Sequence, residues 1–157
     1  MQAAQRWVLL AYRLPREPST PRIALWRRLR QLGAVQLLDG LVGLPLDAHT
    51  REQLEWLAEG IQEAGGGATI WLAEPAGRGH GDALVDEVRT DRSAEFRAVA
   101  AAAERAWEEA PMTRRRTLAR LRRELRRIRA RDYFGAPGRA EAEAAVEALA
   151  AAIEVDA

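Results

Sequence analysis

Short apolar runs alternate with amphipathic helical segments over residues 7–73, and this alternation restricts the possible fold more than any other feature of the chain. Four runs are short and rich in β-branched, aromatic or leucine residues, as strands are. They lie at 7–14, 34–38, 41–46 and 68–73. Asp39 and Gly40, between the second and third runs, form a dipeptide preferred in tight hairpin turns. The pattern therefore predicts four strands, two of which form a hairpin.

Two helices are predicted between these strands. In the first, between Pro21 and Gly33, leucine recurs every three or four residues. In the second, Asp47 and Thr50 are alternative N-caps, and the three glycines at 65–67 end the helix. The resulting order, βαββαβ, predicts an α+β fold with a ferredoxin-like core, in which two helices cover one face of a four-stranded antiparallel sheet.

The predicted strands are apolar at consecutive positions, as in WVLLAY and TIWLA. A sheet with one face in water alternates apolar and polar residues instead. We therefore expect the second face to be covered, either by the C-terminal helices or by a partner chain. A symmetric homodimer through this face is one natural arrangement.

The composition divides the chain into three parts. We expect a ferredoxin-like domain at 6–75, a glycine-rich linker at 76–82, and a C-terminal α-helical subdomain of three helices at 83–157. Such an organisation fits within 157 residues, which are enough for one compact domain or for a small domain with a helical appendage.

The middle helix of the C-terminal part is strongly basic. Residues 111–131 carry ten arginines against the single Glu124, while leucine and isoleucine form one narrow apolar seam. Because the whole chain has a net charge of +1, the remaining residues carry −8. All 24 basic residues are arginine, the side chain best suited to bidentate recognition of phosphate and other oxyanions.

A second basic region surrounds the first loop and helix, and two such regions favour an anionic partner. Phosphates of DNA or RNA are one such partner. The arginines predicted to contact nucleic acid are Arg13, Arg16, Arg22, Arg27, Arg28 and Arg30, together with Arg115, Arg116, Arg122, Arg123 and Arg126.

Two alternatives to nucleic-acid binding remain open at this point. One is an oxyanion-sensing or protein-docking module, in which Arg122, Arg126 and Arg129 bind chromate or sulfate as an effector. The other is that the arginines pair with the acidic residues of the same chain and form only a solvated surface.

Catalytic and cofactor sites are not predicted. The two histidines, His49 and His80, lie in no metal-binding motif, and neither Ser19 nor Ser93 lies in a nucleophile motif. The chain has no cysteine and no apolar run of about 20 residues, the length that a membrane-spanning helix needs. We expect a cytoplasmic protein that is not an enzyme, has no metal or cofactor, and does not bind a membrane.

The run RWVLLAYRLPREPSTPRIALWRRLRQLGAVQLLDGLVGLP, from Arg6 to Pro45, resembles the N-terminal domain of ChrB-type chromate-resistance proteins. The likeness continues through REQLEWLAEGIQEAGGGATIWLAEP and LRRELRRIRARDYFGAPGRAEAEAAVEAL. It implies a transcriptional regulator that represses a chromate-resistance operon and is relieved by chromate. It also implies that basic residues of the N-terminal part contact DNA, which here are Arg13, Arg16, Arg22, Arg27 and Arg28.

Longer members of this family carry a C-terminal domain associated with chromate sensing. We expect the chain to be either an excised N-terminal domain, with the C-terminal sensing domain absent from this chain, or a stand-alone relative. The predicted core is also similar to that of the Cas2 nucleases and of the central domain of PaaX-type repressors. Cas2-like cleavage would need an aspartate at the end of the first strand, where this sequence has Tyr12, Arg13 and Leu14, so nuclease activity is not expected.

Overall fold

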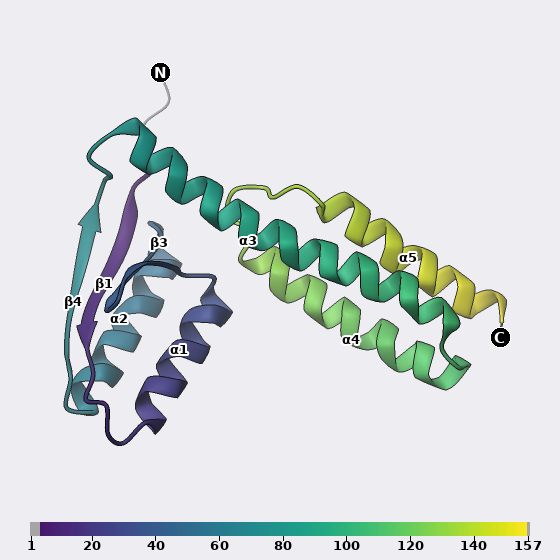
Figure 1. Cartoon of the computed structure of the whole chain (residues 1–157), viewed down its shortest axis with the longest axis horizontal. Coiled ribbons are helices and arrows are strands. Elements are labelled where there is room, and N and C mark those ends of the chain that lie inside the picture. The colour runs from purple at the N-terminus through teal and green to yellow at the C-terminus, as the bar shows by residue number, and fades with distance from the viewer. Residues whose placement is uncertain (1–3, 157) are drawn as a thin grey trace. The chain divides into compact units, whose positions relative to one another are not determined.

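The computed structural model describes residues 4–156, which contain four strands and five α-helices (Figure 1). The strands are β1 (Trp7–Arg13), β2 (Val35–Leu38), β3 (Leu41–Pro45) and β4 (Gly67–Ala73). The α-helices are α1 (Thr20–Leu32), α2 (Ala48–Glu63), α3 (Arg78–Arg105), α4 (Pro111–Ala130) and α5 (Arg139–Val155), and a short 3-10 helix lies at Ala106–Glu108. The predicted α+β class is confirmed.

The four strands form one antiparallel sheet in the order β2-β3-β1-β4. β1 lies inside the sheet, with Val8 opposite Leu44 of β3 on one side and Leu72 of β4 on the other. β2 and β3 form the predicted hairpin around Asp39 and Gly40. Gly40 has a φ of 77°, and a Cβ there would lie 2.6 Å from a backbone oxygen, so the turn requires glycine.

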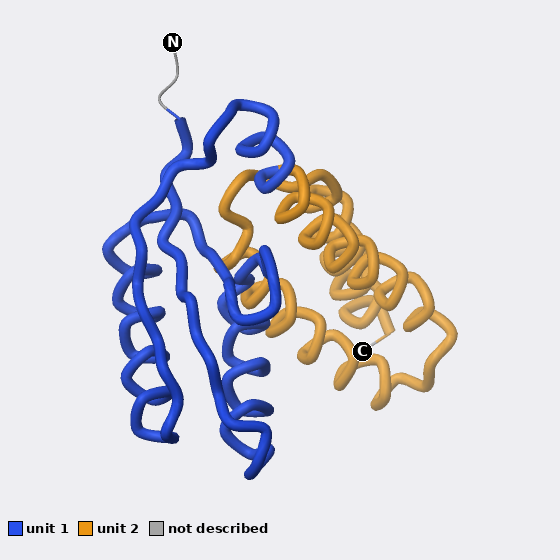
Figure 2. Tube along the Cα trace, turned by 60° about the vertical axis from the view of Figure 1, so that its left-hand side comes forward, with its two compact units in different colours: residues 1–85 blue, residues 86–157 orange. Residues whose placement is uncertain are grey.

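Helices α1 and α2 lie on the same face of the sheet, behind the strands in the blue unit of Figure 2. Successive side chains of a strand point to opposite faces of the sheet. Val8 and Leu10 of β1 therefore lie on the same face as Val42 and Leu44 of β3. All four side chains are buried. The core of this unit also contains Leu25, Leu29 and Leu32 of α1 and Leu54, Ala58 and Ile61 of α2.

The opposite face of the sheet is only partly covered. Trp71 of β4 is 58% exposed, and Leu9, opposite it on β1, and Leu41 on β3 are half-buried. The cover of this face by the C-terminal helices or by a partner chain stays a prediction. Because apolar surface of this kind favours removal from water, the face is a candidate contact surface.

Asp47 and Thr50, predicted as alternative N-caps, act together at the start of α2. The Asp47 carboxylate accepts a hydrogen bond from the Thr50 backbone N–H at 2.7 Å, and the Thr50 hydroxyl accepts one from the Asp47 N–H at 3.0 Å. The same buried hydroxyl donates to the Pro45 carbonyl at 2.6 Å. This capping box therefore fixes the start of α2 to the end of β3.

The chain divides into two compact units, residues 1–85 and 86–157. The second unit contains most of α3 with α4 and α5, and it has its own apolar core, in which Phe96, Leu121 and Leu149 are fully buried. The sequence places the helical subdomain at 83–157, and the second unit begins at Asp86.

The structure differs from the predicted linker at 76–82, because α3 begins at Arg78 and includes five of its seven residues. The Gly81 N–H donates to the Gly77 carbonyl at 3.2 Å and closes the first turn. Two glycines weaken a helix by about 1 kcal/mol each, but each residue added to a 28-residue helix also gains a hydrogen bond. No helix in residues 4–156 combines the length and the apolar character that crossing a bilayer requires.

We predict that Thr50→Ala lowers the free energy of unfolding by about 1–2 kcal/mol, because it breaks the capping box and leaves the buried Pro45 carbonyl without its partner. Urea denaturation followed by circular dichroism measures this change. Thr90→Ala, at an exposed position on α3, is the control and should change the free energy by less than about 0.5 kcal/mol. Equal effects of the two substitutions would contradict the role given to the capping box.

Candidate nucleic-acid interface

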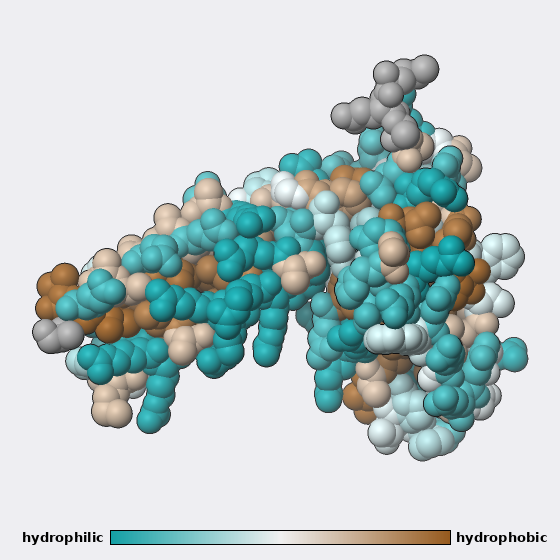
Figure 3. Space-filling view, turned by 180° about the vertical axis from the view of Figure 1, so that it is seen from behind, coloured by the Kyte–Doolittle hydropathy of each residue, from teal (hydrophilic) through white to brown (hydrophobic). Residues whose placement is uncertain are grey.

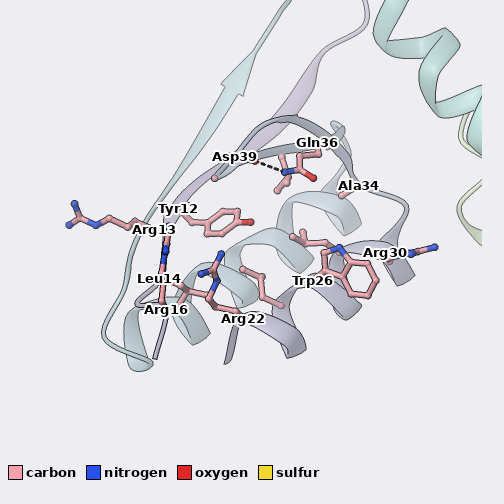
Figure 4. A pocket seen from close by; sticks show the side chains of 14 residues that line it. Tyr12, Arg13, Leu14, Arg16, Arg22, Trp26, Arg30, Ala34, Gln36 and Asp39 are labelled. Atoms are coloured by element: carbon pink, nitrogen blue, oxygen red, sulfur yellow. Dashed lines mark hydrogen bonds between the residues drawn. The ribbon is translucent and has the colours of Figure 1, made fainter. Parts of the chain in front are cut away.

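The first arginine region surrounds a hollow of about 550 Å³ in the first unit (Figure 4). The hollow is formed by the end of β1, the loop after it and one side of α1. The turn between β2 and β3 closes it. The Tyr12 N–H donates to the Gly40 carbonyl at 2.8 Å, which holds the end of β1 against this turn. The lining residues include four of the six predicted arginines: Arg13, Arg16, Arg22 and Arg30.

These four arginines point in different directions. Figure 4 shows Arg16 and Arg22 next to each other beside Tyr12, whereas Arg13 and Arg30 point away from the hollow. Arg30 lies over the ring of Trp26, with its Cζ 4.9 Å from the ring centroid, in a cation–π contact. Within residues 4–156, none of the four forms an ion pair.

The other two predicted arginines of this region lie outside the hollow. The Arg28 guanidinium donates to the Gln53 side chain of α2 at 2.5 Å and to Gln31 at 3.2 Å, so it links the two helices. Arg27 is exposed. The structure therefore brings Arg16 and Arg22 together and assigns Arg28 to the packing of α1 against α2.

The second arginine region is α4, whose apolar seam is buried along its whole length. Leu118, Leu121, Leu125 and Ile128 are all buried. A single seam of this kind leaves the rest of the helix surface to the arginines. Figure 3 shows long hydrophilic side chains projecting from the edge of the second unit that α4 forms.

Five of the ten arginines at 111–131 pair with carboxylates of the second unit. Arg120 pairs with Glu124, Arg122 with Glu147, Arg129 with Glu143, Arg131 with Glu95 and Arg114 with Asp156. The alternative that the chain neutralises its own arginines is therefore true for half of them.

The other five arginines form no ion pair with any described residue and are exposed. They are Arg115, Arg116, Arg123, Arg126 and Arg127. At 100° per residue they fall within an arc of about 120° on the side opposite the buried seam, and they extend over about 18 Å of the helix. We call this row of five the free arginine face.

The predicted alternative site for a small oxyanion also lies in a depression of the surface. Arg122, Arg126 and Arg129 line a hollow of about 370 Å³ together with Glu143 and Glu147. Glu147 lies 3.9 Å from Arg122, and Glu143 lies 3.5 Å from Arg129. Because two carboxylates offset two of the three guanidinium groups, this hollow is a poor site for a small anion.

Some arginines of the second unit have a structural role. The Arg114 guanidinium, with a side chain 13% exposed, donates to the carbonyls of Trp107 at 2.6 Å and Glu109 at 3.2 Å. Arg92 of α3 is buried beside Glu95 and Arg131, and burial lowers its pKa from the ordinary value, partly offset by Glu95. No group of three or more metal-ligating side chains is found among the described residues.

Fold and site together define a small α+β protein with two arginine-rich surfaces. The family model described as "Protein ChrB, N-terminal" matches residues 22–156. The chain therefore belongs to the ChrB N-terminal family, which associates it with chromate resistance, and the predicted resemblance is confirmed. β1, which ends at Arg13, and the loop that carries Arg16 precede the matched residues. No curated protein and no solved structure matches the chain.

Sequence reasoning missed three members of these surfaces. Arg127 belongs to the free arginine face, and a helical projection of α4 would have placed it there, since it follows Arg116 by eleven residues and Arg123 by four. Tyr12 and Trp26 line the first hollow, but no local pattern distinguishes them from core aromatics.

We predict that Arg114→Ala lowers the free energy of unfolding of the second unit by about 2 kcal/mol, because it removes hydrogen bonds from a charged group to backbone carbonyls. Arg115→Ala, which removes the next arginine from the exposed side, is the matched control and should change it by less than about 0.5 kcal/mol. Thermal and urea denaturation measure both. A similar destabilisation in both variants would show that Arg114 has no special structural role.

Proposed function

We propose that the chain is a DNA-binding regulatory domain that acts in chromate resistance and contacts DNA phosphates through its unpaired arginines. The observation that carries this proposal is the free arginine face of α4, where five exposed guanidinium groups have no carboxylate partner among the described residues. Membership of the ChrB N-terminal family supports the link to chromate resistance. Arg16 and Arg22 provide a second group of unpaired cations on the first unit.

The shape of the free arginine face favours a polyanion over a small oxyanion. A row about 18 Å long can contact several successive phosphates, whereas a single sulfate or chromate would contact only one or two of its arginines. The compact alternative around Arg122, Arg126 and Arg129 contains two carboxylates, which oppose anion binding. Phosphate contacts of this kind supply affinity and position the protein without reading base sequence.

We also propose that the first unit has a ferredoxin-like fold. Two helices on one face of an antiparallel sheet with strand order β2-β3-β1-β4 are what a ferredoxin-like core would have, and we assign the unit to that fold. In this proposal the domain binds DNA and does not cleave it. The end of β1 carries Tyr12 and Arg13 in place of the carboxylate that metal-dependent cleavage would use.

We predict that the chain binds duplex DNA at low salt and that the affinity falls steeply as salt rises, because arginines that bind phosphates release counterions. The double substitution Arg123→Ala and Arg127→Ala should weaken binding and reduce the salt slope by about 1 for each phosphate that is no longer neutralised. Fluorescence anisotropy with labelled duplex DNA at several salt concentrations measures both effects.

The charge-matched control for this experiment replaces Arg97 and Arg105, two exposed arginines of α3, with alanine. This variant has the same net charge as the first but an intact free arginine face. An equal decrease of affinity in the two variants would mean that only net charge matters. Absence of binding by the unsubstituted chain at low salt would overturn the proposal.

We also propose that the chain forms a homodimer through the partly covered face of the sheet. Leu9, Leu41 and Trp71 share this face with uncharged neighbours such as Ala11 and Thr69. A mainly apolar patch can pack against its own copy across a two-fold axis, with Arg13 at the end of β1 lying at its edge.

We predict that Trp71→Arg converts this dimer to a monomer, because it places a charge on each copy at the centre of the interface. Light scattering coupled to size-exclusion chromatography measures the mass. Trp56→Arg, at an equally exposed position on α2, is the control and should leave the dimer intact. A monomer mass for the unsubstituted chain at all concentrations would contradict the dimer.

A further inference from the structure

The hollow of the first unit contains more than DNA phosphates require. Its lining includes Tyr12, the indole of Trp26, and the apolar side chains of Leu25 and Leu29 of α1. Phosphate contact alone would need only the arginines, which bind oxyanions from any exposed position. The aromatic and polar parts of the hollow therefore require a different explanation.

Trp26 is placed as a stacking surface. It is 57% exposed although it is a large apolar side chain, and Arg30 lies over its ring at 4.9 Å. A second planar group can stack on an indole in such a position. Stacking of a nucleic-acid base on an aromatic side chain contributes about 1–3 kcal/mol to the binding free energy. The guanidinium of Arg30 restricts the movement of the ring and prepares it for this contact.

Across the hollow from Trp26 lies a polar wall made by Gln36 and Asp39 (Figure 4). The Gln36 amide donates to the Asp39 carboxylate over 3.4 Å, a long and weak contact, and both side chains are exposed. An amide offers both a donor and an acceptor, and a carboxylate accepts two or more hydrogen bonds. This combination suits the edge of a heterocyclic base that carries N–H groups.

The cationic end of the hollow is formed by Arg16 and Arg22, which lie next to each other beside Tyr12. Neither pairs with a carboxylate among residues 4–156, and Asp39 is the one acidic residue of the lining. Two adjacent guanidinium groups without a partner attract a doubly charged group such as a terminal phosphate. The volume of about 550 Å³ lies in the range of small-molecule sites.

We propose that this hollow binds a nucleoside phosphate, with the base stacked on Trp26, its edge at Gln36 and Asp39, and its phosphate at Arg16 and Arg22. The ligand is either a free nucleotide or the unpaired terminal nucleotide of a single strand. A base inside a duplex cannot reach Trp26, because its faces are covered by its neighbours. A bare oxyanion would use only the arginine end. The inference deepens the proposed function, with which it shares Arg16 and Arg22.

Isothermal titration calorimetry of the full chain tests the inference with AMP, GMP, CMP and UMP, a short 5′-phosphorylated single strand, the same sequence as a duplex, and sodium sulfate. We expect saturable binding of a mononucleotide or of the single strand, and the tighter of the two identifies the source of the ligand. Sulfate should bind much more weakly than either, because it makes no stacking contact.

Trp26→Ala should weaken nucleotide binding by about tenfold or more, as removal of one stacking partner implies. Trp56→Ala is the matched control, since Trp56 is also 57% exposed but lies outside the hollow, and it should bind as the unsubstituted chain does. Arg16→Ala, at an exposed loop position, should weaken binding to a similar degree and tests the inference even if Trp26→Ala fails to fold.

The inference is overturned if sulfate binds as tightly as the nucleotides, or if Trp26→Ala and Trp56→Ala bind alike. The variant that carries both Arg123→Ala and Arg127→Ala distinguishes a failure of this inference from a failure of the proposed function. It should have a lower duplex affinity and unchanged nucleotide binding. No nucleotide binding but normal duplex binding in the unsubstituted chain would reject the hollow alone, and the reverse result would reject the DNA-binding proposal alone.

Discussion

The antiparallel pairing of β1 with both β3 and β4 is the interaction on which the first unit depends. It sets the register in which Val8 and Leu10 face the helices while Leu9 turns to the opposite face with Trp71. A shift of one residue would exchange these faces, so the core and the candidate contact surface are fixed by the same hydrogen bonds. The pairing also brings the end of β1 to the hairpin turn, where Gly40 accepts from Tyr12 and the hollow closes.

A second constraint organises the helical unit. One apolar seam buries one side of α4, and guanidinium groups cannot be buried without partners, so the arginines must find carboxylates or remain in water. The carboxylates that reach them lie on α3, on α5 and on α4 itself, with Asp156 just beyond the end of α5. They satisfy the arginines at the sides of the helix. The side opposite the seam has no carboxylate partner among the described residues of the unit, and its arginines stay unpaired.

Much of this arrangement could be predicted from local sequence. Leucine periodicity indicates α1, the Asp39-Gly40 dipeptide indicates the hairpin, and the density of arginine indicates the basic face of α4. The rest depends on contacts between distant residues. Arg114 donates to Asp156, 42 positions away, and nothing near Arg114 distinguishes this structural arginine from Arg115. The cooperation of Asp47 with Thr50 and the presence of Trp26 in the hollow likewise depend on three-dimensional placement.

The two arginine surfaces differ in what they can recognise. The free arginine face of α4 presents only cations, so its attraction to a polyanion is general and depends on salt. The hollow of the first unit adds an indole, an amide and a carboxylate to its two guanidinium groups, and each addition excludes ligands that lack a matching group. The proposed DNA binding needs affinity for phosphates in general, whereas the proposed nucleotide site needs selectivity. In this chain the first property suits α4, and the second suits the hollow, because selectivity requires the uncharged contacts that α4 lacks.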